Sequence, residues 1–192
     1  MRVAFHINHF TLRGTEVAML EYAKSLRTYQ SIEGCFLTPQ SALDAADESV
    51  LSKFKNNFSL TIYHEDFEID KIITQLGAKL LYQLNSGDDH RFLSKVVPNV
   101  VHVVFPVELQ NRSNVYYVAI SNWLASCVYG TKLPFINHIV DSPKALPCLR
   151  NQLGLQSKDI VFGCYGGISS FDLEFVRNVV QRLNKKNKSI KW

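Results

Sequence analysis

The fold of this chain is constrained most by six short apolar segments, at residues 3–7, 33–37, 58–63, 79–84, 100–105 and 116–120. Stretches of helical character lie between several of them. Segments that are apolar on successive residues are typical of strands buried on both faces, and strands that alternate with helices predict a parallel sheet. We therefore expect a Rossmann-like α/β domain, in which an open parallel sheet carries helices on both faces.

The first of these segments leads into a polar loop and an amphipathic helix within residues 8–26. Thr15 is expected to be the N-cap of this helix, because its hydroxyl can accept a hydrogen bond from the first turn. Gly14 allows the backbone to approach an anion, the unpaired N–H groups of the first turn attract negative charge, and Arg13 adds a positive charge. Arg13, Gly14 and Thr15 therefore form a candidate phosphate-binding loop, with an ordinary strand-to-helix turn as the alternative. The dinucleotide pattern GxGxxG is absent from this loop.

Polar residues follow two other strands at the point where each ends. Asn85, Ser86 and Gly87 follow the fourth segment, and Ser121 and Asn122 follow the sixth. Ligands of open α/β sheets bind outside the carboxyl ends of the strands, so these residues are candidates for contacts to a polar ligand. Turn formation and helix capping are the alternatives for the same residue types.

A second α/β unit begins late in the chain. Residues 134–147 contain three prolines and little periodicity, which indicates an irregular connection. Residues 159–165 predict a strand, and a helix is expected over 170–183 with Val176, Val179, Val180 and Leu183 as its core stripe. We therefore expect a first domain at 1–157, with a connecting segment at about 134–157, and the incomplete start of a second Rossmann-like domain at 158–192.

The charge pattern is mildly basic and local. The net charge is +4, and six basic residues lie between Arg177 and Lys191. Lys185, Lys186 and Lys188 are expected to complement the dipole at a helix C-terminus. No basic stripe with interleaved aromatic residues appears elsewhere, so no nucleic-acid partner is expected. A weak peripheral attraction to anionic membrane surfaces, or to phosphorylated ligands, is the better use of this charge.

The four cysteines are widely scattered and show no metal-ligand spacing. A reducing, cytoplasmic compartment is therefore the expected location.

Four pieces of the chain together resemble a known family. They are Gly14-Thr15-Glu16 with the helix behind it, the strand that ends in Ser121, the segment Ile139-Val140-Asp141, and the glycine-rich residues 159–167. In this order and spacing they resemble the N-terminal half of a GT-B glycosyltransferase, from the retaining group similar to glycosyltransferase family 4. The family has a double glycine in the first loop where this chain has Arg13-Gly14.

The resemblance implies a hexosyltransferase that moves a sugar from a nucleotide-sugar to a sugar, lipid or protein acceptor with retention of configuration. Gly163, Gly166 and Gly167 would approach the donor diphosphate from the side opposite Arg13, Gly14 and Thr15, with an ordinary loop turn as the alternative. Asn85, Ser86, Gly87, Ser121 and Asn122 would then contact sugar or acceptor. No metal is expected in the active site, and no cofactor besides the nucleotide-sugar donor.

The resemblance also bears on catalysis and on the extent of the chain. His102 is a weak catalytic candidate, because family members carry a histidine near this strand end; a satisfied core histidine is the alternative. The family's paired glutamates of the donor site would lie beyond Trp192, so the 192-residue chain is expected to be inactive alone. A non-catalytic module that binds an acceptor or a partner is the alternative function.

Overall fold

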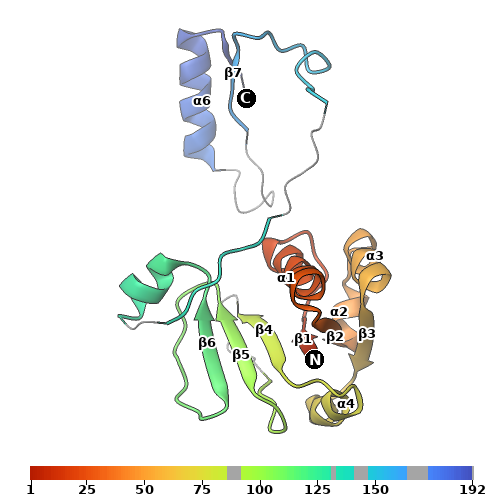
Figure 1. The fold of residues 1–192 in the computed structure, drawn as a ribbon. Helices are drawn as coiled ribbons and strands as arrows, with labels where there is room; N and C mark the ends of the chain where they lie inside the picture. The colour runs from red at the N-terminus through yellow and green to blue at the C-terminus, as the bar shows by residue number, and fades with distance from the viewer. Residues whose placement is uncertain (86–91, 131–132, 141–146, 164–172, 192) are drawn as a thin grey trace. The chain divides into compact units, whose positions relative to one another are not determined.

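The computed structural model describes residues 1–85, 92–130, 133–140, 147–163 and 173–191. The chain forms two compact units, Met1–Asp141 and Ser142–Trp192, each with its own sheet (Figure 1). The sheet of the first unit consists of β1 (Arg2–His6), β2 (Glu33–Pro39), β3 (Ser59–Tyr63), β4 (Leu81–Asn85), β5 (Asn99–Val103) and β6 (Val115–Ala119). The strands lie in the order β3-β2-β1-β4-β5-β6, and every neighbouring pair is parallel. The expected Rossmann-like parallel sheet is confirmed.

Helices cover both faces of this sheet, also as expected. Alternate side chains of a strand point to opposite faces, so Ala4 and Phe5 of β1 belong to different cores. Phe5 packs with apolar side chains of α1 (Gly14–Gln30), α2 (Gln40–Asp44) and α3 (Glu48–Asn57). Ala4 packs with side chains of α4 (Ile69–Gln75), which follows the short 3₁₀ helix η1 (Asp66–Glu68). The π-helix η2 (Leu124–Val128) covers Val101 and Val103, which continue the α4 face across β5.

Helix α1 packs very closely on the sheet at one glycine. A Cβ placed on Gly34 of β2 would lie 3.2 Å from Phe5 Cε2 and 3.3 Å from Ala23 Cβ. Both distances are below ordinary van der Waals contact, and both neighbours are completely buried. Gly34 therefore sets how near α1 can lie to β1 and β2.

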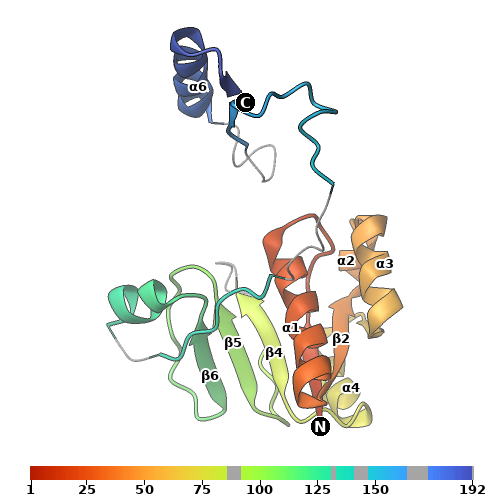
Figure 2. The same ribbon diagram turned by 45° about the horizontal axis from the view of Figure 1, so that its top comes forward.

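The segment after η2 extends the sheet and then crosses its α1 face. The Ala119 N–H donates to the Pro134 carbonyl, and the Ile136 N–H donates to the Ala119 carbonyl, both at 2.9 Å. The chain then runs towards α1, where the Tyr22 hydroxyl donates to the Asn137 carbonyl at 3.1 Å (Figure 2). Residues 134–140 therefore form a strap from the β6 edge to α1.

The second unit contains a parallel β-α-β arrangement. β7 (Ile160–Val161) pairs with β8 (Ile190–Lys191), and α6 (Glu174–Lys186) connects them. The core stripe expected for this helix is wrong in part: Val176 and Val180 are half-buried, but Val179 is 50% and Leu183 37% exposed. The physical reason is that a two-stranded sheet is too narrow to cover the whole apolar side of a helix.

The close approach at Gly34 gives a stability prediction. Gly34→Val should lower the free energy of unfolding by about 1–3 kcal/mol, because its methyl groups must displace Phe5 or Ala23 in a packed core. Urea denaturation followed by circular dichroism measures the change. Gly14→Ala is the control, because a Cβ at Gly14 meets no atom within 4 Å. Equal stability of the Gly34→Val variant and the wild type would show that α1 can move away from the sheet freely.

Candidate functional site

The strand order places a topological switch point between β1 and β4. From β1 the chain moves outward through β2 and β3, and from β4 it moves the other way through β5 and β6. The two central strands pair directly, from Ala4 against Leu81 to His6 against Gln83. The ligand crevice of an open α/β sheet lies outside the carboxyl ends of the strands at such a point. The fold therefore favours a ligand near the residues that follow β1 and β4.

The loop after β1 leads to the beginning of α1 at Gly14. Exposed Arg13 is its N-cap residue, with an extended backbone (φ −97°, ψ 161°) and no side-chain cap hydrogen bond. The prediction that Thr15 is the N-cap is wrong, because its hydroxyl donates to Glu16 Oε2 at 2.6 Å. In the described part of the chain, the N–H groups of the first turn therefore have no capping side chain, and Gly14 leaves the space before them open.

A buried carboxylate lies in this first turn, and the sequence did not reveal its burial. Glu16 is only 3% exposed, and its two oxygens accept hydrogen bonds from Thr11 Oγ1 at 2.8 Å and from Thr15 Oγ1. A carboxylate in the first turn complements the helix dipole. Glu16 therefore fixes the loop from the inside, and it engages the Thr15 hydroxyl that a ligand would otherwise meet. The signal in the sequence was the pair of threonines, Thr11 and Thr15, that precede the acidic residue Glu16.

Asn85 ends β4 at the switch point and is 3% exposed. Its carbonyl accepts the Val104 N–H at 3.0 Å, which continues the pairing of β4 with β5. The structure thus places Asn85 at the predicted edge but largely inside the protein. Ser86 and Gly87, the neighbouring candidates, lie outside the described residues.

Ser121 and Asn122 lie after β6 and make local hydrogen bonds. Ser121 Oγ accepts the Leu124 N–H at 3.1 Å, and Asn122 Oδ1 accepts the Ser126 hydroxyl at 3.0 Å. Both contacts support the start of η2, which corresponds to the helix-capping alternative. Exposed Trp123 follows them and presents a large aromatic surface at the same edge.

His102 is completely buried on the α1 face of β5. Its Nδ1 lies 2.6 Å from the Tyr82 hydroxyl, and its ring centroid is 5.5 Å from that of Tyr22. Burial lowers the pKa of His102 to about 4, and His138 of the strap lowers it further, whereas the backbone of Ala119 and Ile136 acts in the opposite direction. The imidazole is therefore neutral at pH 7. His102 is thus a core residue beneath the strap, and its side chain is not exposed to solvent.

A second buried histidine was missed because it stands in an apolar segment. His6, the last residue of β1, has Nε2 2.6 Å from the Tyr63 hydroxyl at the end of β3. Burial lowers the pKa of His6 to about 4, and nearby Asp66 partly opposes this shift. Burial also raises the pKa of Tyr63, so this pair is neutral at pH 7.

The remaining candidates belong to the second unit. Gly163 follows β7 and is exposed, and a Cβ there would meet no atom within 4 Å. Gly166 and Gly167 lie outside the described residues. In the sequence, these glycines follow β7 and precede α6, which is the order of strand, phosphate-binding loop and helix in a β-α-β unit.

The described residues contain no group of three or more histidine, cysteine, aspartate or glutamate side chains arranged to hold a metal ion. No helix among them is long and apolar enough to cross a membrane.

Comparison with known proteins does not name a family. No protein-family model matches the sequence. No curated protein is significantly similar to it. The interpretation of the site therefore depends on the geometry above.

The two buried histidines predict a pH-dependent stability. Both should stay neutral in the folded state down to about pH 4, whereas the unfolded imidazoles take up protons near pH 6.5. The unfolded state then binds more protons between these values, so stability is full above pH 6.5 and falls as the pH drops towards 4. The loss is at most roughly 3 kcal/mol per histidine.

Urea denaturation at a series of pH values measures this dependence. His6→Gln and His102→Gln should each flatten the curve between pH 6.5 and 4, and His9→Gln, at an exposed position, is the matched control. A curve as steep in both buried variants as in the wild type would contradict the assignment.

Proposed function

We propose that the chain belongs to a retaining glycosyltransferase of the GT-B type and contributes the acceptor-side domain. The observation that carries the proposal is the uncapped start of α1, with exposed Arg13, beside the switch point of a 3-2-1-4-5-6 parallel sheet. This position suits the diphosphate of a nucleotide-sugar, because main-chain N–H groups and a guanidinium there attract negative charge. The separate β-α-β unit with a glycine-rich loop supports the same proposal, since GT-B enzymes consist of two Rossmann-like domains.

In this proposal the site holds the leaving group. As the bond between the anomeric carbon and the phosphate oxygen breaks, Arg13 and the N–H groups of Gly14 and Thr15 stabilise the charge that develops on the diphosphate. The acceptor hydroxyl attacks the anomeric carbon from the same side, and its proton passes to the departing phosphate oxygen. The new glycosidic bond therefore keeps the configuration of the donor, and no carboxylate nucleophile is required.

Glu16 restricts how the diphosphate can bind. Its carboxylate lies one residue beyond Thr15 and has both threonine hydroxyls as partners. A phosphate must therefore be held by the main chain of the first turn and by Arg13, with little help from the Thr15 side chain. The positive charge of Arg13 offsets the negative charge of Glu16, which makes Arg13 the residue on which anion binding depends most.

A non-catalytic binding module is the second candidate function. It is favoured by the local roles of the polar residues at the sheet edge, because Ser121 and Asn122 support η2 and Asn85 is buried. Local roles of this kind suit the holding of an acceptor or partner as well as they suit chemistry.

Nucleotide-sugar binding tests the proposal. A panel of uridine- and guanosine-diphosphate sugars is titrated into the protein and binding is followed by calorimetry and by thermal shift. Arg13→Ala should weaken binding of the best ligand roughly tenfold or more, because it removes a charge-assisted contact worth about 1.5–3 kcal/mol. Gly14→Val should do the same by filling the space before the first turn, without loss of stability.

Arg112→Ala is the matched control. Arg112 is an exposed arginine just before β6, and it therefore lies at the opposite, amino edge of the same sheet. Equal effects of Arg13→Ala and Arg112→Ala, or no binding across the panel, would refute a donor site at α1. Arg13-dependent release of nucleoside diphosphate would favour the transferase over the binding module.

A further inference from the structure

An open groove of about 520 Å³ lies on the second unit, outside the site described above. Its lining comes from α6 and the turn after it: Arg177, Val180, Gln181, Asn184, Lys185 and Lys188. Three of these side chains are cations, two are amides, and none is acidic. The composition is that of a site for an anion.

The turn that carries Lys188 is fixed against α6. The Asn187 N–H donates to the Leu183 carbonyl at 2.8 Å, and Asn187 Oδ1 accepts the Ser189 N–H at 2.9 Å. The Asn184 amide donates to the Ile190 carbonyl, which ties α6 to β8. These bonds hold the backbone that presents Lys185 and Lys188, so the groove does not have to be assembled when a ligand binds.

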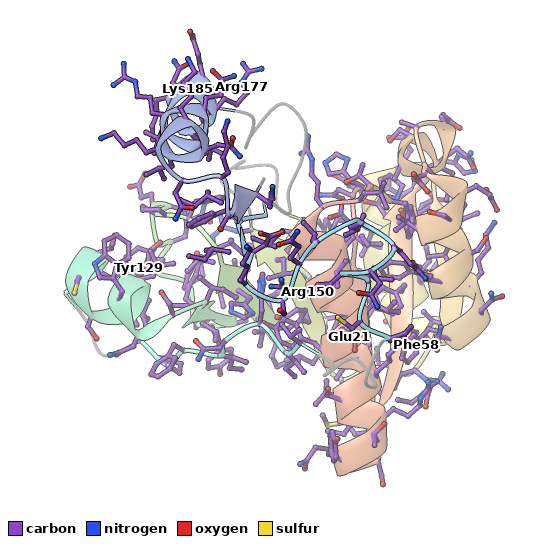
Figure 3. The ribbon with its side chains drawn as sticks, turned by 90° about the horizontal axis from the view of Figure 1, so that it is seen from above. Glu21, Phe58, Tyr129, Arg150, Arg177 and Lys185 are labelled. Carbon is purple, nitrogen blue, oxygen red and sulfur yellow. The ribbon has the colours of Figure 1, made fainter. Side chains whose placement is uncertain are left out.

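Complementation of the helix dipole explains only part of this charge. Lysines in the last turn of α6, such as Lys185, are favourable for that reason. Arg177 lies near the first turn, where a cation opposes the dipole. It nevertheless lies on the same side of α6 as Lys185, two helical turns away (Figure 3). The alignment of Arg177 with Lys185 therefore points to a role for the groove as a whole.

The net charge of the second unit also favours anion binding. Ser142–Trp192 has nine basic and three acidic residues and a net charge of +6, whereas Met1–Asp141 has twelve basic and fourteen acidic residues and a net charge of −2. Among the described residues, neither Lys185 nor Lys188 forms an ion pair. The field of the second unit therefore draws anions to it, and the two lysines keep their charge available.

We propose that Arg177, Lys185 and Lys188, with the Gln181 amide, bind a ligand that carries two adjacent phosphate groups. The planar guanidinium of Arg177 suits two oxygens of one phosphate, and the two ammonium groups suit the charge of the next. The phosphates come from a free diphosphate compound or from a lipid headgroup. Exposed Phe175 and Val179 lie on roughly the opposite side of α6, so a helix inserted in a membrane by these residues would turn the groove away from it. This proposal is independent of the glycosyltransferase proposal.

Pyrophosphate titrated into the full 192-residue protein tests it by calorimetry. The double variant Lys185→Glu/Lys188→Glu should lose affinity roughly tenfold or more, because two attractive contacts become repulsive. The matched control is Arg182→Glu/Lys186→Glu, which changes the net charge equally on the same helix but alters no residue of the groove. We expect it to change the affinity less than about threefold. Unchanged far-ultraviolet circular dichroism of both variants confirms that α6 still folds.

Vesicles distinguish the two sources of phosphate. The protein is sedimented with phosphatidylcholine vesicles that contain or lack diacylglycerol pyrophosphate, a lipid whose headgroup has two adjacent phosphates. Binding that needs this lipid, Lys185 and Lys188, and that pyrophosphate displaces, supports the groove and identifies a headgroup. Pyrophosphate binding without such sedimentation supports the groove and identifies a free ligand. No binding of either probe, or equal losses in both double variants, would overturn the proposal.

Discussion

The pairing of β1 with β4 is the interaction on which the rest of the first unit depends. β1 is buried on both faces, since Ala4 packs under α4 and Phe5 under α1. A strand in this position cannot move without disturbing two cores. Its pairing with β4 also creates the point at which the chain direction diverges, and α1 starts from the carboxyl end of β1. The buried centre of the sheet thus holds the loop between β1 and α1 at a defined position.

Local sequence patterns predicted most of this sheet because burial on both faces makes most positions of a strand apolar. All six expected strands are present, within about two residues at their ends. The N-cap of α1 was not predictable in the same way. Thr15 can bond either to the backbone or to Glu16, and the choice depends on whether Glu16 is buried. That burial depends in turn on Thr11 and on the path of the loop, which no local pattern contains.

The buried histidines and α6 are two further cases in which local sequence does not determine the structure. His6 stands in an apolar strand and forms a buried pair with Tyr63, fifty-seven residues away, so its partner cannot be found from spacing. The apolar side of α6 was recognisable from its period, but the period does not say what covers it. With β7 and β8 alone beneath the helix, Val179 and Leu183 stay exposed. A periodic stripe therefore predicts which residues share a side of a helix, and the width of the neighbouring sheet decides which of them are buried.

The two candidate anion sites differ in how their charge is balanced. At the start of α1, the helix dipole and Arg13 attract an anion. The negative charge of the buried Glu16 carboxylate already offsets part of this positive potential. Binding there requires close main-chain contact, which favours a ligand of defined shape. In the groove of α6, Lys185 and Lys188 form no ion pair with the described residues, so attraction acts at longer range and depends less on shape. Added salt should therefore weaken binding at the exposed groove more than at the start of α1, because ions screen long-range attraction between exposed charges most strongly.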